Sequence, residues 1–128
     1  MMQIITNMEI KELTKAEEEI MQVLWNLGKA FVKDILAKLP EPKPAYNTVS
    51  TIVRILEQKG FVAFEAFGKT HQYYTKVSKT DYTKFATNKI KNSFFGNSAS
   101  AMMSFFIENE QIDLKELDEI LKIIEARK

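Results

Sequence analysis

Residues 46–58 combine side chains that could bind nucleic acid with the spacing of an amphipathic helix. Apolar residues recur at the i, i+3, i+4, i+7 spacing that buries one stripe of a helix, as Val49, Ile52, Val53 and Leu56. The other side carries amide, hydroxyl and guanidinium groups, namely Asn47, Ser50, Thr51 and Arg54. Such groups can reach base edges or phosphates in a major groove. Thr48 is either a further contact or a cap for the start of the helix.

A β-hairpin is predicted directly after this helix. Residues 61–67 and 70–77 are rich in aromatic and β-branched side chains, and Gly68-Lys69 supplies a tight turn between them. The turn would bring Lys69, Thr70 and His71 close to a phosphate backbone. Tyr73 and Tyr74 point to opposite faces of their strand, so one packs inward and the other is free to reach phosphate. The sequence leaves open which is which, and Tyr73 is included among the predicted contacts.

Two further helices must position these elements. The first begins at Thr14, where Thr14-Lys15-Ala16-Glu17 has the capping-box pattern, and ends at Gly28. The second covers about 32–39, and the proline-rich run 40–44 is a stiff turn that cannot be helical. A supporting helix, a turn and a reading helix that begins near Ala45 form a helix-turn-helix. With the hairpin, the pattern predicts a winged helix.

The C-terminal part is predicted to consist of helices over 81–95, 99–107 and from Asp113 onward. These short helices carry more large apolar residues than they can bury among themselves, which favours association with a second copy of the chain. The residues predicted to form that contact are Phe94, Phe95, Met102, Phe105, Phe106, Leu114, Leu117, Leu121 and Ile124.

Composition excludes several classes of function. The chain has 128 residues, a net charge of +1, no Cys and one His, which rules out disulfides, thiol chemistry and a Cys/His zinc site. Residues 43–77 hold five cations against two carboxylates, so positive charge gathers on the predicted reading segment. The sequence has no membrane-spanning run and no targeting signal, and a cytoplasmic location is expected. No catalytic motif surrounds His71, so neither an enzyme nor a cofactor is expected.

Four segments resemble, in order and spacing, the penicillinase repressor family of bacterial winged-helix regulators. They are the first-helix run from Leu13 through Val23-Leu24-Trp25 to Gly28, then Asn47–Thr51 followed by Lys59–Val62, then Gly68–Tyr74, then Ser100–Phe106. The resemblance covers nearly the full length. It implies a homodimeric repressor, with an N-terminal winged helix and a C-terminal helical dimerisation segment, bound to a dyad-symmetric DNA operator.

The resemblance also implies a route of regulation. In this family a membrane sensor's signal ends in proteolysis of the dimerisation segment, often at an Asn-Phe bond, and the matching bond here is Ser104-Phe105. The chain lacks the Cys-rich C-terminus of the copper-responsive branch. Its Arg54 stands one position away from the family's usual arginine, which is about 100° around a helix.

The sequence thus predicts a mainly α-helical protein with a small β-hairpin. Residues 1–12 form a lead-in without an assigned function, 13–78 a winged-helix DNA-binding domain, and 79–128 a helical dimerisation domain. Two alternatives remain. A protein-binding winged helix would need an exposed apolar patch on helix 46–58. A small-molecule-responsive regulator would need a pocket lined by Phe94, Phe95, Phe105 and Phe106.

Overall fold

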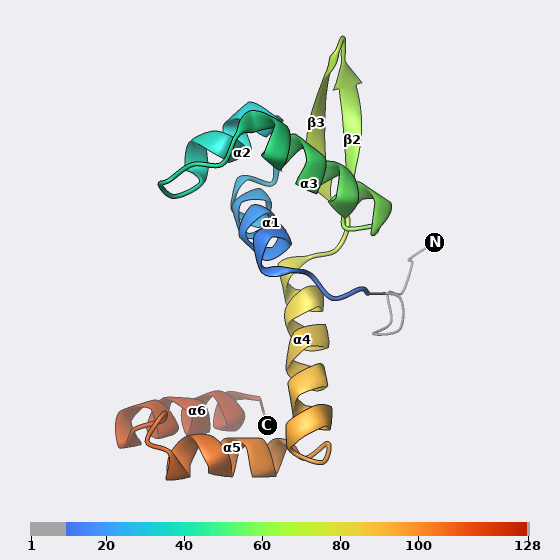
Figure 1. The fold of residues 1–128 in the computed structure, drawn as a ribbon. Coiled ribbons are helices and arrows are strands. Elements are labelled where there is room, and N and C mark those ends of the chain that lie inside the picture. Colours follow the sequence, from blue (N-terminus) through green and yellow to red (C-terminus); the bar gives the residue numbers. More distant parts are fainter. Residues whose placement is uncertain (1–9, 128) are drawn as a thin grey trace. The chain divides into compact units, whose positions relative to one another are not determined.

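The computed structural model describes residues 10–127, so most of the lead-in predicted for 1–12 lies outside the described residues. The chain is mainly helical, with one small antiparallel sheet, as the sequence predicts (Figure 1). It divides into two compact units, with the division between Ala86 and Thr87. The elements of the first unit are α1 Lys15–Leu27, β1 Lys29–Ala30, α2 Val32–Lys38, α3 Tyr46–Gln58, β2 Val62–Phe67 and β3 Thr70–Thr75, together with the start of α4 Lys79–Phe94.

Helix α1 begins and ends as predicted. The Thr14 hydroxyl accepts a hydrogen bond from the Glu17 amide, and the Glu17 carboxylate accepts one from the Thr14 amide, which completes the capping box. Gly28 ends the helix at φ 82°, a conformation that favours glycine, and its amide donates to the Leu24 carbonyl.

The turn between α2 and α3 is held by a lysine as well as by its prolines. The Lys43 ammonium donates to the carbonyls of Leu36, Ala37 and Leu39 at 2.7–3.1 Å and so satisfies the free end of α2. Helix α3 then starts after Ala45, which has no side-chain capping bond. The alternative that Thr48 caps this helix is wrong, because Thr48 already lies within α3 and only its backbone amide bonds back to Ala45.

The predicted hairpin is confirmed, and a third strand joins it. β2 and β3 pair from Val62 with Thr75 to Phe67 with Thr70, and Gly68 takes the positive φ of 64° that the turn requires. The short β1 pairs with the other edge of β3, so the strand order is β1-β3-β2. Two residues carry too little pattern to reveal a strand, and the sequence did not indicate β1.

One hydrophobic core joins α1, α2, α3 and the sheet. Its fully buried side chains include Met21, Leu24, Ile35, Val49, Val53, Leu56 and Phe61. The predicted interior stripe of α3 is confirmed, with Ile52 partly buried at its edge. Trp25 packs against the core, and its indole donates to the Val77 carbonyl at 2.9 Å. Ile10, inside the predicted lead-in, is buried in the same core.

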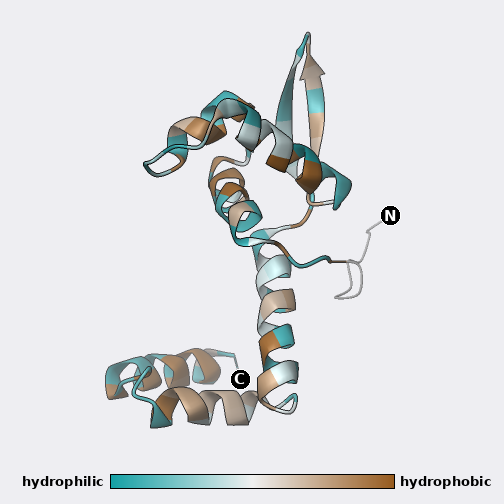
Figure 2. Ribbon diagram, viewed as in Figure 1, coloured by the Kyte–Doolittle hydropathy of each residue, from teal (hydrophilic) through white to brown (hydrophobic). Residues whose placement is uncertain are grey.

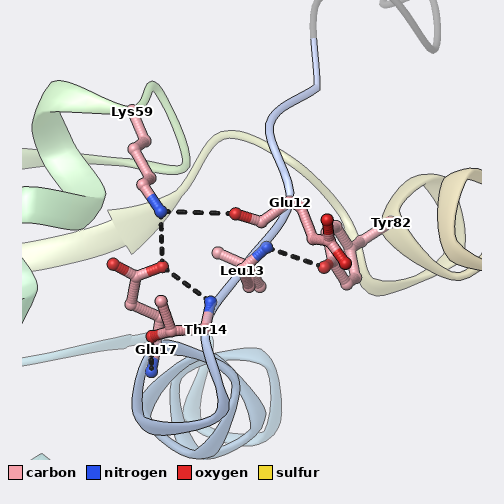
Figure 3. Close-up of polar contacts among 6 residues, drawn as sticks. All are labelled: Glu12, Leu13, Thr14, Glu17, Lys59 and Tyr82. Atoms are coloured by element: carbon pink, nitrogen blue, oxygen red, sulfur yellow. Dashed lines mark hydrogen bonds and ion pairs between the residues drawn. The ribbon is translucent and has the colours of Figure 1, made fainter.

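A polar junction ties the start of α1 to the end of α3 and the start of α4 (Figure 3). The Lys59 ammonium lies 2.6 Å from a carboxylate oxygen of Glu17 and 3.3 Å from the Glu12 carbonyl. The Tyr82 hydroxyl accepts a hydrogen bond from the Leu13 amide at 2.9 Å. Burial by itself would raise the pKa of Glu17, but the bonds from Lys59 and Thr14 outweigh it and lower that pKa.

The second unit, from Thr87 on, contains the rest of α4, α5 Ala99–Glu108 and α6 Leu114–Ala126. Ser98 caps α5, and Asp113 accepts from the Glu116 amide at the start of α6. Hydrophobic residues run along both helices (Figure 2), and yet neither has a buried residue. Phe94 is 78% exposed and Leu114 84%. Within residues 10–127, no helix is long and apolar enough to cross a membrane.

Candidate nucleic-acid interface

The outer side of α3 presents the polar groups that the sequence placed there. Asn47, Thr51 and Arg54 are exposed and Ser50 is partly exposed, while Val49, Val53 and Leu56 hold the inner side in the core. The Arg54 guanidinium donates to the Ser50 hydroxyl at 3.2 Å, which links two neighbouring groups one turn apart. The hydrophobic stripe thus decides which face of α3 is available to a ligand.

A groove of about 570 Å³ lies between α2, α3 and the β2–β3 hairpin. It will be called the α2–α3–wing groove. Its lining residues come from all three elements and are Phe31, Val32, Lys33, Tyr46, Asn47, Ser50, Arg54, Lys69, Thr70, His71 and Tyr73. Seven of the nine residues predicted to contact DNA therefore share one surface, although they are up to 26 positions apart in the chain.

The groove is positively charged. Lys33, Arg54 and Lys69 each bring a cation from a different element, and no carboxylate is among the lining residues. None of the three cations forms an ion pair within the part of the chain that the structure describes. Unneutralised cations beside amide and hydroxyl donors suit a phosphate-bearing ligand.

The structure decides between the two tyrosines of β3. Tyr73 is 5% exposed and packs inward, whereas Tyr74 is 43% exposed. Burial raises the pKa of Tyr73, and the charge of Glu57 acts in the same direction, while Arg54 opposes it. Tyr73 therefore contributes a wall of the groove, whereas Tyr74 is exposed but is not among the residues that line it.

Aromatic contacts hold the hairpin. His71 stacks on Phe64 with ring centroids 3.9 Å apart, and Tyr73 packs beside both rings. Near the turn, Phe67 meets Phe31 edge to face at 5.8 Å. Phe31 immediately precedes α2, so this contact joins the far end of the hairpin to the helix-turn-helix.

Sequence reasoning missed four lining residues and included two that lie elsewhere. Phe31, Val32, Lys33 and Tyr46 line the groove but were not predicted, and Thr48 and Thr51 are exposed outside it. Tyr46 could have been found, because it stands one residue before Asn47 at the start of the same helix. Lys33 could not, since nothing local shows that α2 approaches the hairpin.

The alternative functions find less support in this geometry. Helix α3 exposes two large hydrophobic side chains, Tyr46 at 50% and Ile55 at 37%, amid polar neighbours. Phe95 packs against Phe105, and Phe105 against Phe106, at ring distances of 5.5 and 6.3 Å, so these aromatics contact one another. No cluster of potential metal ligands occurs among residues 10–127.

Comparison with known proteins gives consistent matches along the chain. A family model described as penicillinase repressor matches residues 13–126. The penicillinase repressor of Bacillus licheniformis is 24% identical over 94% of both chains. The methicillin resistance regulatory protein MecI of Staphylococcus aureus strain N315 is 24% identical over 91% of this chain and 95% of its own. A solved structure titled CopR Repressor Structure is 32% identical, covering 51% of this chain and 96% of its own, with a TM-score of 0.44.

Proposed function

The chain belongs to the penicillinase repressor family, whose members are transcriptional repressors and not enzymes, and on that premise we propose that it represses by binding a dyad-symmetric operator as a homodimer. The observation that carries the proposal is the α2–α3–wing groove, which joins the polar side of α3 to the hairpin and is lined by three cations and no carboxylate.

In this proposal α3 lies in the major groove. Asn47, Ser50 and Thr51 face base edges, and Thr48 lies beside them on the exposed side. Arg54 sits farther along α3 and contacts phosphate, as do Lys69, Thr70 and His71 of the hairpin. The protein acts in the cytoplasm, where bacterial DNA is accessible to it.

Exposed hydrophobic residues of the second unit support the homodimer. Helices α5 and α6 expose Phe105, Leu114, Leu121 and Ile124, and neither helix buries any residue within one chain. Such a surface needs a partner, and a second copy supplies a matching one. Phe94, Phe95, Met102, Phe106 and Leu117 complete the proposed contact. Two reading helices would then engage half-sites about one helical turn apart.

Release from DNA is proposed to come from disruption of this dimer contact. Ser104 and Phe105 are exposed in α5, so a protease that cuts between them would divide the proposed dimer surface. A membrane sensor would act through such a protease without inserting this chain into the membrane. Serine at the position where the family often has asparagine favours a protease with different side-chain recognition.

The test is selection of bound fragments from the genome of the source organism, followed by footprinting and salt titration. We expect recovered sites with dyad symmetry and a log affinity that falls with log salt by roughly 0.9 per phosphate neutralised. Lys69→Ala should flatten that slope. Equal affinity for recovered and random duplexes, or binding insensitive to salt, would refute the proposal.

A further inference from the structure

The two sides of the α2–α3–wing groove carry cations from segments that are far apart in the sequence. Lys33 lies in the first turn of α2, and Lys69 lies in the hairpin turn, with Arg54 of α3 also in the lining. The contact between Phe31 and Phe67 joins these two sides directly, since Phe31 precedes α2 and Phe67 precedes the turn. The packing of Phe67 against Phe31 therefore brings Lys33 and Lys69 into the lining of the same groove.

The helix side of the groove also offers a neutral donor. Tyr46 begins α3, is 50% exposed and lines the groove together with Lys33. A phenol hydroxyl can donate to a phosphate oxygen without displacing a counterion. Lys33 and Tyr46 thus provide a charged and an uncharged donor on the same side.

Cations spread over three elements suit an extended polyanion better than a single anionic group. A lone phosphate would be met by convergent donors, whereas a sugar-phosphate backbone presents successive charges along its length. We propose, resting on the function above, that one strand of the operator lies along this groove, contacted by Lys33 and Tyr46 from the helix side and by Lys69 from the hairpin side.

The experiment compares Lys33→Ala with Lys38→Ala. Both residues are exposed lysines of α2, but Lys38 lies in the last turn and outside the groove. Affinity is measured by fluorescence anisotropy for a recovered operator duplex and for a shuffled duplex, at salt concentrations from about 50 to 200 mM. Thermal melting of each variant confirms that it is folded.

We expect Lys33→Ala to lower the salt slope by about 0.9 for each protomer, and so by about 1.8 for a dimer, as Lys69→Ala should. Affinity for both duplexes should fall by the same factor, so that the preference for the operator is unchanged. Lys38→Ala should leave the slope at its wild-type value.

Tyr46→Phe separates the neutral contact from the charged one. Binding should weaken severalfold while the salt slope stays at the wild-type value, because no charge is removed. If Tyr46→Phe binds the operator with wild-type affinity, the Tyr46 hydroxyl does not contact the operator strand. If Lys33→Ala keeps the wild-type slope while Lys69→Ala lowers it, the helix-side contact is refuted and DNA binding stands. A wild-type protein without salt dependence would instead refute the proposed function.

Discussion

At the scale of single residues, Glu17 is the clearest case of a side chain with two structural roles. It completes the capping box of α1 and pairs with Lys59 beyond the end of α3. Its side chain is only 7% exposed and that of Lys59 is 23% exposed, so water screens this pair less than a surface ion pair. The junction therefore makes the packing of α1 against α3 sensitive to charge.

We predict that Lys59→Met destabilises the protein by about 2 kcal/mol at neutral pH, because it removes the charged partner of the buried Glu17 carboxylate. The pKa of Glu17 is lowered in the folded state from its ordinary value of 4.5. Its contribution is thus present above about pH 4.5 and is lost as the pH falls through the lowered folded-state value. The free energy of unfolding of both proteins is measured at several pH values by urea unfolding, followed by the fluorescence of Trp25, the single tryptophan.

Lys76→Met is the matched control, since Lys76 is exposed and forms no ion pair among residues 10–127. This substitution should change the free energy of unfolding by no more than about 0.5 kcal/mol at every pH. If Lys59→Met lowers the free energy of unfolding by as much at pH 3.5 as at pH 7, the charge of Glu17 is not the cause of the destabilisation.

At the scale of elements, the β2–β3 hairpin is held at both ends. Near the core, β1 pairs with β3, and near the turn, Phe67 packs on Phe31. A hairpin on its own is marginally stable, so these two attachments decide how well Lys69 and Thr70 keep their place in the groove. The short β1 strand and the residue after it therefore serve the proposed DNA contact indirectly.

We predict that Phe67→Ala lowers operator affinity by about 2- to 10-fold, which corresponds to the loss of one aromatic pair. The salt slope should not change, because no charge is removed. Tyr74→Ala is the control, since Tyr74 is a similarly exposed aromatic of the hairpin outside the groove. Equal losses in the two variants would mean that the Phe31 contact does not position the wing.

At the scale of the whole molecule, the two units differ in how they bury hydrophobic side chains. The first unit contains every buried residue in the described chain, and the second contains none. A segment of this size without an interior cannot be stable as an isolated chain. Its exposed hydrophobic residues are therefore where the proposed contact between two copies would form.

We predict that Leu121→Glu converts the protein from dimer to monomer, because it places a charge in the proposed hydrophobic contact. Sedimentation velocity should show the smaller species, and operator affinity should fall by at least about 100-fold as the two half-sites lose their coupling. Lys115→Gln makes the same change in net charge at an exposed polar position of α6 and should remain dimeric. A dimeric Leu121→Glu variant would exclude this surface of α6 from the contact.

The local structure of this chain could be predicted from its sequence because the signals are local. The capping box at Thr14, the prolines after α2, the stripe of α3 and the Gly68-Lys69 turn each act within a few residues. These signals also identified most of the groove, since Asn47, Ser50, Arg54 and the turn residues belong to elements whose exposed sides follow from periodicity.

Only the tertiary structure decided which segments meet. Tyr73 rather than Tyr74 faces inward because the sheet packs one face on the core, and alternation along a strand cannot say which face that is. Three further features depend on contacts between distant parts of the chain. Lys33 lines the groove, β1 pairs with β3, and Glu17 pairs with Lys59, which lies 42 positions later in the sequence. Sequence determined the elements and their polar sides, whereas packing between them determined the composition of the groove.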